Sequence, residues 1–299
     1  MRLLKSKMFK IICKFNTDQT TSGSLIVEPK VSELLSFEKN KITIYTMRSY
    51  ILAETNWKNI KDANIELAIL PWSATEAHNY HLPYGTDIYE ANHITAESAR
   101  IAYEAGAKCM VLPTIPFGVN SGQHDILLDI NLNPSTQMII LRDIITVLNR
   151  QGIYKLLVFN SHGGNSFKPM IRELGLEFPK MFICESNWFK AMDRNQYAEL
   201  DGDHADEIET SLMMYIEPNL VLPLSEAGDG ATKRHKIKAF REPWLWAERR
   251  WSQITEDTGC GDPSRSTAAK GEKFFTDLCE KFAKLLVELS DLDIEDMYV

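Results

Sequence analysis

The chain has 299 residues, of which 44% are hydrophobic and 25% charged, with a net charge of −8 at pH 7. This balance is typical of a soluble globular protein with a full core. The acidic charge disfavours a nucleic-acid partner, because proteins that bind phosphate backbones concentrate Lys and Arg. Small molecules or proteins are therefore the expected partners.

The cysteines and the apolar runs bear on location. The odd, scattered cysteines predict reduced thiols in a cytoplasmic protein, not a disulfide framework. No apolar run approaches the ~20 residues that span a bilayer, so no membrane association is expected. The cysteines, none of them in a CxxC pair, are Cys13, Cys109, Cys184, Cys260 and Cys279.

The first 30 residues are predicted to form an N-terminal arm. Residues 17–24 are polar and turn-forming, and the basic start is interrupted by lysines with no small-residue cleavage site after it. An arm is therefore favoured over a signal peptide. Residues 31–299 are expected to form one domain.

Short apolar runs alternate with amphipathic stretches along this domain. Runs suited to buried strands lie at residues 65–70, 109–112, 156–159 and 181–184. Helices are expected after residue 87, from residue 133, near residue 165, and over about 204–215 and 270–290. This alternation predicts an α/β fold with a mainly parallel sheet and helices on both faces. Residues 223–263, which hold three tryptophans, are expected to be irregular, and a lid, an oligomer contact and a surface loop all stay open for them.

Polar side chains follow the first of these strands. Glu76 and His78 lie two residues apart in the loop, and Asp87 stands where the next helix begins. Loops at the carboxyl ends of parallel strands form the ligand crevice of such folds. Glu, His and Asp are ligands for ions such as Zn²⁺ or Mn²⁺. An ordinary polar loop is the alternative.

A second polar turn follows the strand at 156–159. His162 comes directly after the strand, and Gly163 and Gly164 allow close approach of the backbone to a ligand. A phosphate-binding turn is a weaker interpretation, because the full GxGxxG or Walker spacing is missing. A structural histidine is the other alternative.

The third stretch is acidic and is expected to be helical. His204, Glu207 and Ser211 would then share one face, while Glu209 would turn away. His204 and Glu207 could therefore complete a metal site. A solvated acidic first turn, favoured by the helix dipole, is the preferred interpretation for Asp203 and Asp206.

In this order and spacing, the three motifs resemble those of the creatininase (creatinine amidohydrolase) family. The likeness runs from about residue 65 to residue 275. It includes further short matches at Pro116-Phe117-Gly118, His124, Gly261-Asp262-Pro263 and Lys270-Gly271.

The resemblance implies a three-layer α/β/α sandwich, a homo-oligomer (often a hexamer) and two divalent metal ions per chain, Zn with Mn or Fe as alternatives. Glu76 and His162 resemble the ligands of one metal, His78 a ligand of the other, and Asp87 the bridging carboxylate. His204 matches a histidine of proton transfer.

Other positions are assigned by the same resemblance. Creatinine-hydrolysing members carry a Glu where this chain has Gly164, and Glu207 is expected to supply that carboxylate here. Substrate contacts are expected at His124, Trp188, Gly163 and Gly164. Departures at Ala77, Asn79 and residues 133–136 surround the site without removing a ligand.

The predicted function is hydrolysis of an amide, lactam or formamide C–N bond in a small molecule. A metal-dependent phosphoesterase and a catalytically silent metal-binding scaffold subunit are the alternatives. Creatinine is not expected to be the main substrate, because residues 200–203 hold no aromatic side chain to pair with Trp188. The carboxylates of Asp201 and Asp203 are expected to favour a more polar substrate.

Overall fold

The computed structural model describes residues 34–38, 41–45, 47–242 and 244–299. The chain divides into two units, and the boundary lies between Met47 and Arg48. In the first unit, β1 (Leu34–Glu38) and β2 (Lys41–Tyr45) pair as antiparallel strands. The predicted arm at residues 1–30 lies outside the described residues. The second unit spans residues 48–299, and the predicted domain start at residue 31 stays a prediction.

The second unit alternates strands and helices, as the apolar pattern predicts. Its strands are β3 (Leu67–Trp72), β4 (Cys109–Val111), β5 (Lys155–Asn160), β6 (Phe182–Asn187), β7 (Gly202–His204) and β8 (Cys260–Gly261). Its α-helices are α2 (Trp57–Ile60), α3 (Thr86–Glu104), α4 (Pro134–Arg150), α5 (Lys168–Glu177), α6 (Glu207–Ile216), α7 (Lys238–Arg241), α8 (Trp251–Ile254) and α9 (Ala268–Asp291). Short 3-10 turns include η2 (Ser121–Gln123), η3 (Trp188–Lys190) and η4 (Arg194–Gln196).

The central sheet has the strand order β4-β3-β5-β6, and its strands are parallel. Successive side chains of a strand point to opposite faces, and both faces are apolar here. In β5, Leu157 and Phe159 enter one core cluster while Leu156 and Val158 enter the other. A strand buried on both sides explains why the apolar runs are continuous and not alternating.

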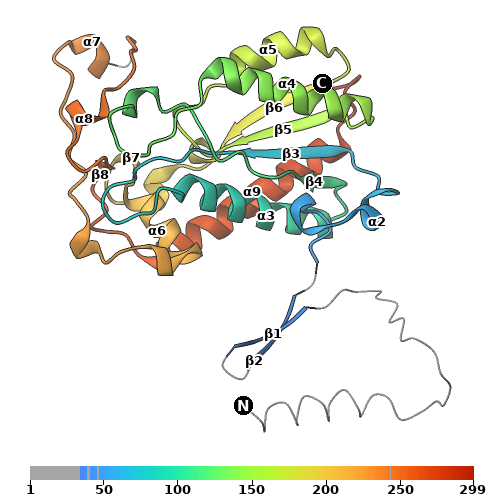
Figure 1. Cartoon of the computed structure of the whole chain (residues 1–299), viewed down its shortest axis with the longest axis horizontal. Coiled ribbons are helices and arrows are strands. Elements are labelled where there is room, and N and C mark those ends of the chain that lie inside the picture. The colour runs from blue at the N-terminus through green and yellow to red at the C-terminus, as the bar shows by residue number, and fades with distance from the viewer. Residues whose placement is uncertain (1–33, 39–40, 46, 243) are drawn as a thin grey trace. The chain divides into compact units, whose positions relative to one another are not determined.

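Helices cover both faces of the sheet (Figure 1). Residues of α3, α6 and α9 pack into one core cluster, and residues of α4 and α5 pack into the other. The predicted α/β/α architecture is therefore confirmed. None of the described helices is both long and apolar enough to cross a lipid bilayer.

One predicted helix begins later than expected. His204 ends the short strand β7, which pairs with β8, and α6 begins only at Glu207. Between them Ala205 has a positive φ of 50°, and the side chain of Asp206 caps α6 by accepting from the N–H groups of Ile208 and Glu209. The chain therefore turns between the two candidate ligands His204 and Glu207 instead of carrying both on one helix.

Helices α6 and α9 pack so closely at Gly271 that a methyl group does not fit. A Cβ built on Gly271 would lie 1.9 Å from the carbonyl oxygen of Ser211. We expect Gly271→Ala to separate the two helices and to lower the free energy of unfolding by about 1–3 kcal/mol. Urea denaturation of the purified protein measures this.

Gly175 is the matched control, because it is an exposed glycine in α5 with nothing within 4 Å of its built Cβ. Gly175→Ala should raise the free energy of unfolding by roughly 0.5–1 kcal/mol, since alanine loses less conformational freedom in a helix. Equal effects of the two substitutions would contradict the close contact.

Candidate metal centre

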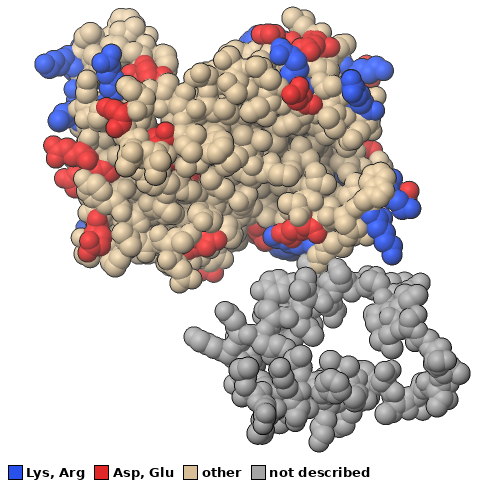
Figure 2. All heavy atoms as spheres, viewed as in Figure 1, with Lys and Arg blue, Asp and Glu red and all other residues tan. Residues whose placement is uncertain are grey.

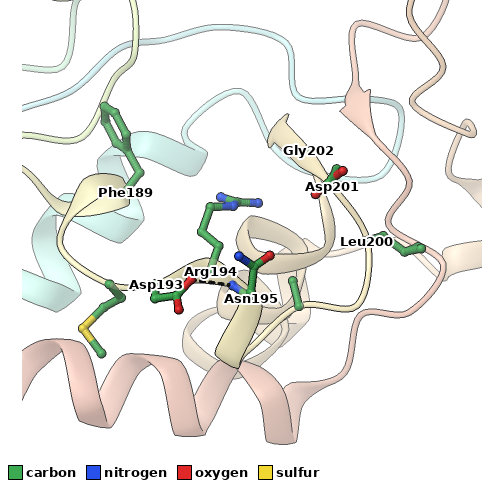
Figure 3. A pocket seen from close by; sticks show the side chains of 9 residues that line it. Phe189, Asp193, Arg194, Asn195, Leu200, Asp201 and Gly202 are labelled. Atoms are coloured by element: carbon green, nitrogen blue, oxygen red, sulfur yellow. Dashed lines mark hydrogen bonds between the residues drawn. The ribbon is translucent and has the colours of Figure 1, made fainter.

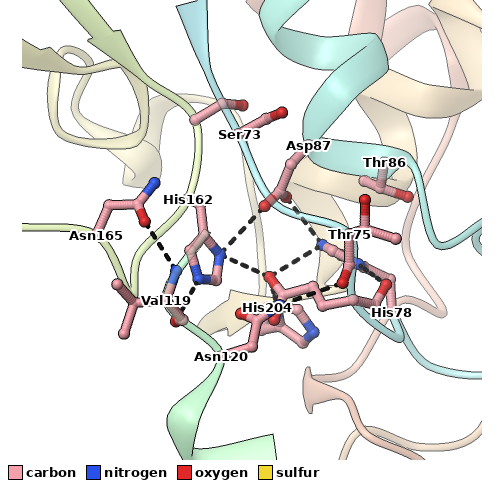
Figure 4. A network of polar contacts seen from close by, with 12 residues as sticks. Ser73, Thr75, His78, Thr86, Asp87, Val119, Asn120, His162, Asn165 and His204 are labelled. Atoms are coloured by element: carbon pink, nitrogen blue, oxygen red, sulfur yellow. Dashed lines mark hydrogen bonds and ion pairs between the residues drawn. The ribbon is translucent and has the colours of Figure 1, made fainter. Parts of the chain in front are cut away.

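Carboxylates and imidazoles converge at the carboxyl edge of the sheet (Figure 4). Glu76 and His78 come from the loop after β3, Asp87 from the first turn of α3, His162 from the turn after β5, and His204 from the end of β7. Each of these residues is at most 6% exposed. The structure thus brings together five residues singled out from the sequence, four as ligands and His204 for proton transfer.

The carboxylate of Asp87 lies between two imidazoles. His78 Nε2 is 3.1 Å from Asp87 Oδ1, and His162 Nδ1 is 3.1 Å from Asp87 Oδ2. Glu76 Oε1 lies 2.7 Å from His162 Nδ1 and 3.9 Å from His204 Nδ1. A carboxylate with one oxygen toward each of two ligand groups has the arrangement of a bridging ligand.

Each of the three imidazoles is fixed by a backbone carbonyl. His78 Nδ1 lies 3.1 Å from the carbonyl oxygen of Glu76, His162 Nε2 lies 3.0 Å from that of Val119, and His204 Nε2 lies 2.8 Å from that of Ala77. Because a carbonyl only accepts, these ring nitrogens carry the hydrogens. The second nitrogen of each ring faces the cluster, which is the second-shell arrangement typical of metal-ligating histidines.

Glu209, and not Glu207, joins the cluster. One ligand atom each from His78, Asp87 and Glu209 lie within 4.8 Å of one another. The carboxylate of Glu207 points elsewhere: it pairs with Lys270 Nζ at 2.5 Å and accepts from the N–H groups of Glu199 and Leu200. The expected ligand role of Glu207 therefore passes to Glu209 in the ligand set proposed below.

The expectation that His204 and Glu207 share one helix face is wrong, because His204 lies in strand β7 and not in a helix. A usable signal was present, however, since Asp206 and Glu209 have the spacing of a capping box. Glu209 Oε2 accepts from the N–H of Ala205 at 2.5 Å, and Asp206 caps the helix. With Asp206 as the cap, the direction of the Glu209 side chain follows from the start of α6 and does not depend on His204.

The turn that carries His162 leaves no room for a side chain at Gly164. A Cβ there would lie 2.2 Å from the carbonyl oxygen of Val119 and 2.4 Å from His162 Nε2. A side chain would therefore displace the bond that orients His162. Gly163 is different, because nothing lies within 4 Å of its built Cβ and it faces open space.

Gln123 was not singled out from the sequence. It lies in η2, is 3% exposed, and donates from Nε2 to Glu76 Oε2. Because one oxygen of Glu76 is held by this amide, the other is left to face His162. No pattern in the sequence marked this residue, since its contact depends on the path of the loop after β4.

Trp188 and His124, the two side chains expected to contact the substrate, differ in exposure. Trp188 is fully buried in the core, where it packs edge-on against Phe274 and donates from Nε1 to Ser161 Oγ at 3.0 Å. Its position beside Ser161 supports the turn of His162 and does not offer an aromatic face to a substrate. His124 is exposed, and its role stays a prediction.

An aromatic ring reaches the cluster from the segment whose role was left open. The ring centroid of Trp251 lies 4.8 Å from that of His204. In addition, Arg249 forms an ion pair with Asp203, so this carboxylate is not free. Residues 200–203 hold no aromatic side chain, as the sequence shows, but Trp251 brings an indole to the cluster from another segment, and the expectation that creatinine is not the main substrate stays a prediction.

A cavity of about 400 Å³ lies on another side of the β7–α6 turn (Figure 3). Its wall includes Phe189, Asp193, Arg194, Leu200 and Gly202, and it contains none of the cluster residues. Arg194 reaches from this wall to the carboxylate of Asp206. The cavity therefore lies beside the ion pair at the start of α6, and none of the metal-ligating groups lines it.

Burial and mutual charge shift the pKa values of the cluster strongly. Burial alone would lower the pKa of His78, but its hydrogen bond to Asp87 and the charges of Asp87 and Glu76 raise it to about 10. Burial would likewise lower the pKa of His162, but the carboxylate of Glu76 raises it well above its usual range. Burial raises the pKa of Glu209 to about 8.

Two other groups shift in ways that matter for chemistry. Burial and the neighbouring His78 lower the pKa of His204, so this imidazole is neutral near pH 7. Burial and the charge of Glu209 raise the pKa of Glu90, and neither oxygen of Glu90 has a hydrogen-bond partner among the described residues. Its protonated form is therefore favoured.

The donor set fits divalent ions that accept nitrogen and oxygen ligands. Two groups of three donors share Asp87: Glu76, Asp87 and His162 form one, and His78, Asp87 and Glu209 form the other. Imidazole with carboxylate suits Zn²⁺ and Mn²⁺. The protons held by His78 and His162 would leave when a cation takes their place.

Comparisons with known proteins show the family of the chain. The family model "Creatininase: Creatinine amidohydrolase" matches residues 53–286. A creatinine amidohydrolase of Pseudomonas putida is 28% identical over 199 residues, which cover 58% of this chain and 74% of that protein. A mycofactocin precursor peptide peptidase of Mycobacterium ulcerans is 23% identical over 223 residues, 71% of this chain and 81% of that protein.

The fold has close counterparts among solved structures. A Bacteroides fragilis protein proposed to be a creatinine amidohydrolase is 42% identical to this chain, with a TM-score of 0.78. The match covers 82% of this chain and 98% of that chain. The likeness therefore extends beyond the motifs to most of the chain.

The raised pKa values predict that the metal-free protein loses stability in alkali. His78 binds its proton more tightly in the folded state, so its contribution is complete below pH 6.5 and is lost as the pH rises toward 10. The raised pKa of Glu209 acts in the same direction up to about pH 8. We expect the Tm of chelator-treated protein to fall between pH 6.5 and 9, by roughly 2–4 °C per kcal/mol lost.

The control for this experiment is the same titration with Zn²⁺ present. Because the cation holds the donors deprotonated, the alkaline loss should shrink or vanish. Groups whose pKa is lowered, such as His204, gain stability only up to about their unfolded pKa of 6.5 and do not oppose the trend above it. A Tm of metal-free protein that is flat or rising over this range would refute the assignment.

Proposed function

The chain belongs to the creatininase family, and from that premise we propose that it is a metal-dependent amidohydrolase with two divalent ions at the cluster. The observation that carries the proposal is the set of three imidazoles, each tied by one ring nitrogen to a backbone carbonyl and turned by the other toward carboxylates. The substrate would be an amide, lactam or formamide of a small molecule.

The proposed ligands follow the two groups of donors. Glu76 and His162 would hold one ion, His78 and Glu209 the other, and Asp87 would bridge them. When bound, such ions polarise a substrate carbonyl and lower the pKa of a water toward ~7. Zn²⁺ and Mn²⁺ are the candidates, because the donors are imidazole nitrogens and carboxylate oxygens.

His204 is the proposed group for proton transfer. Its pKa is lowered by burial and by His78, and its Nε2–H is held by the carbonyl oxygen of Ala77, so Nδ1 is free to take a proton. In hydrolysis a C–O bond forms and the C–N bond breaks. The proton of the attacking water would pass to Nδ1 and then to the leaving nitrogen.

A phosphoesterase is less well supported, because the cations around the β7–α6 turn are engaged. Arg249 pairs with Asp203, Arg194 with Asp206, and Lys270 with Glu207. On the face seen in Figure 2, Lys and Arg gather toward the ends with Asp and Glu near them, and the middle is largely uncharged. This surface does not favour a polyanionic substrate.

A peptide substrate is the second candidate. It is favoured by the relative named as a mycofactocin precursor peptide peptidase. A short peptide and a small lactam both contain the amide that such a site would cleave, and therefore both belong in the substrate test. The proposed homo-oligomer and its size stay predictions.

The ligand set is tested by two glutamates of one helix. Glu209→Gln should reduce bound metal from about two ions per chain to about one, because an amide is a poor ligand for Zn²⁺. Glu207→Gln should keep both ions, since the carboxylate it removes serves Lys270 and backbone N–H groups. Elemental analysis after metal loading and dialysis measures the content.

Asp87→Ala should lose both ions, because the proposed bridge serves both groups of donors. Loss of metal in Glu207→Gln with full retention in Glu209→Gln would restore the original sequence-based assignment. Circular dichroism of each variant separates loss of ligand from loss of fold.

The activity is tested on zinc- or manganese-loaded protein with formamides, small lactams including creatinine, and short peptides. At least one class should be hydrolysed, and His204→Asn should lower kcat by about 10²–10⁴-fold with metal content unchanged. A phosphate monoester serves as the control substrate. Hydrolysis of the ester alone would show that the amidohydrolase proposal is wrong.

A further inference from the structure

Trp251 is the aromatic side chain that borders the cluster from the segment before β8. It opens α8, is partly exposed, and its ring lies edge-on to His204 with the centroids 4.8 Å apart. His204 in turn lies 4.1 Å, centroid to centroid, from His78. His204 therefore contacts both the indole and one proposed ligand.

Contacts on both sides seat Trp251 in this position. The guanidinium of Arg249 pairs with both carboxylate oxygens of Asp203 in β7, and its Cζ lies 5.7 Å from the centroid of the Trp251 ring. On the other side, Ser252 Oγ donates to Asp125. The chain on either side of Trp251 is thus tied to the strand that carries His204 and to the loop after η2.

The backbone before Trp251 rests on a glycine of η2. A Cβ built on Gly122 would lie 2.2 Å from the carbonyl oxygen of Arg249, so only glycine allows this approach. The next residue, Gln123, donates to the proposed ligand Glu76. The seat of Trp251 and the position of a metal ligand therefore depend on the same short turn.

The neighbouring tryptophans behave differently. Trp244 and Trp246 are 73% and 81% exposed, whereas Trp251 is turned toward the cluster. Because Trp246 lies in the same segment and has no ring contact with a cluster residue among the described residues, it provides a matched control for the removal of an exposed indole.

Building on the proposed function, we propose that Trp251 contacts the substrate and selects amides that carry a planar group beside the scissile carbonyl. A molecule whose carbonyl reaches the donors meets His204 and, next to it, the indole of Trp251. A planar group gains binding energy from stacked or edge-to-face contact with an aromatic ring, and a methyl group in its place lacks this aromatic contact. The ring is the specificity element, and Arg249 and Gly122 hold it in place.

The test measures binding, so that it does not depend on turnover. Benzohydroxamate and acetohydroxamate share the metal-chelating group and differ in the planar ring. Calorimetry with zinc-loaded full-length protein gives the ratio of their dissociation constants. Trp251→Leu should reduce the preference for benzohydroxamate by roughly 2- to 12-fold, which corresponds to the loss of one aromatic pair.

Two control variants show whether the effect is specific to the aromatic ring at position 251. Trp251→Phe should keep most of the preference, because a ring remains, and Trp246→Leu should keep all of it. Metal content must equal that of the wild type in each variant. An unchanged ratio in metal-replete Trp251→Leu would overturn the proposal, as would wild-type protein that binds neither compound.

The outcome separates this inference from the proposed function. A ratio that falls in Trp251→Leu, in a protein that hydrolyses no amide, would keep the aromatic contact and reject the hydrolase. Amide hydrolysis together with an unchanged ratio would keep the hydrolase and reject the contact.

Discussion

The site depends on three backbone carbonyls that each fix one nitrogen of an imidazole. A histidine presents a lone pair in a known direction only when its other nitrogen is held. The carbonyl oxygens of Glu76, Ala77 and Val119 do this for His78, His204 and His162. Two of the carbonyls belong to the loop after β3 and the third to the loop after β4, so the neighbouring strands of one sheet determine the orientation of all three rings.

The sequence predicts the parts of this arrangement that are local. Continuous apolar runs identify the buried parallel strands, and a polar turn after a strand identifies the carboxyl edge where Glu76, Asp87 and His162 meet. The direction of the Glu209 side chain could not be predicted from the helical pattern, because the positive φ of Ala205 breaks the helix that the pattern predicts. The contact of Trp251 with the cluster could not be predicted, since its place depends on backbone contact with Gly122, far away in the chain.

Burying so many ionisable groups would destabilise the fold unless they compensate one another. The acid groups divide into two kinds by environment. Glu76 stays charged because the imidazoles around it outweigh the effect of burial, whereas Glu209 and Glu90 have raised pKa values because burial and neighbouring acids prevail. In the absence of a cation, the cluster is balanced by protons on His78 and His162.

This balance connects folding to metal binding. A cation that binds must displace those protons, and its own charge then replaces theirs beside the carboxylates. Glu90 belongs to the same balance of charges, because its two buried oxygens have no hydrogen-bond partner among the described residues. It lies one turn after Asp87 on α3 and is influenced electrostatically by Glu209. Burial is the main cause of its raised pKa, and the charges of Glu209 and Asp87 add to it, so a change of charge at the centre would also shift the pKa of Glu90, which is not one of the proposed ligands.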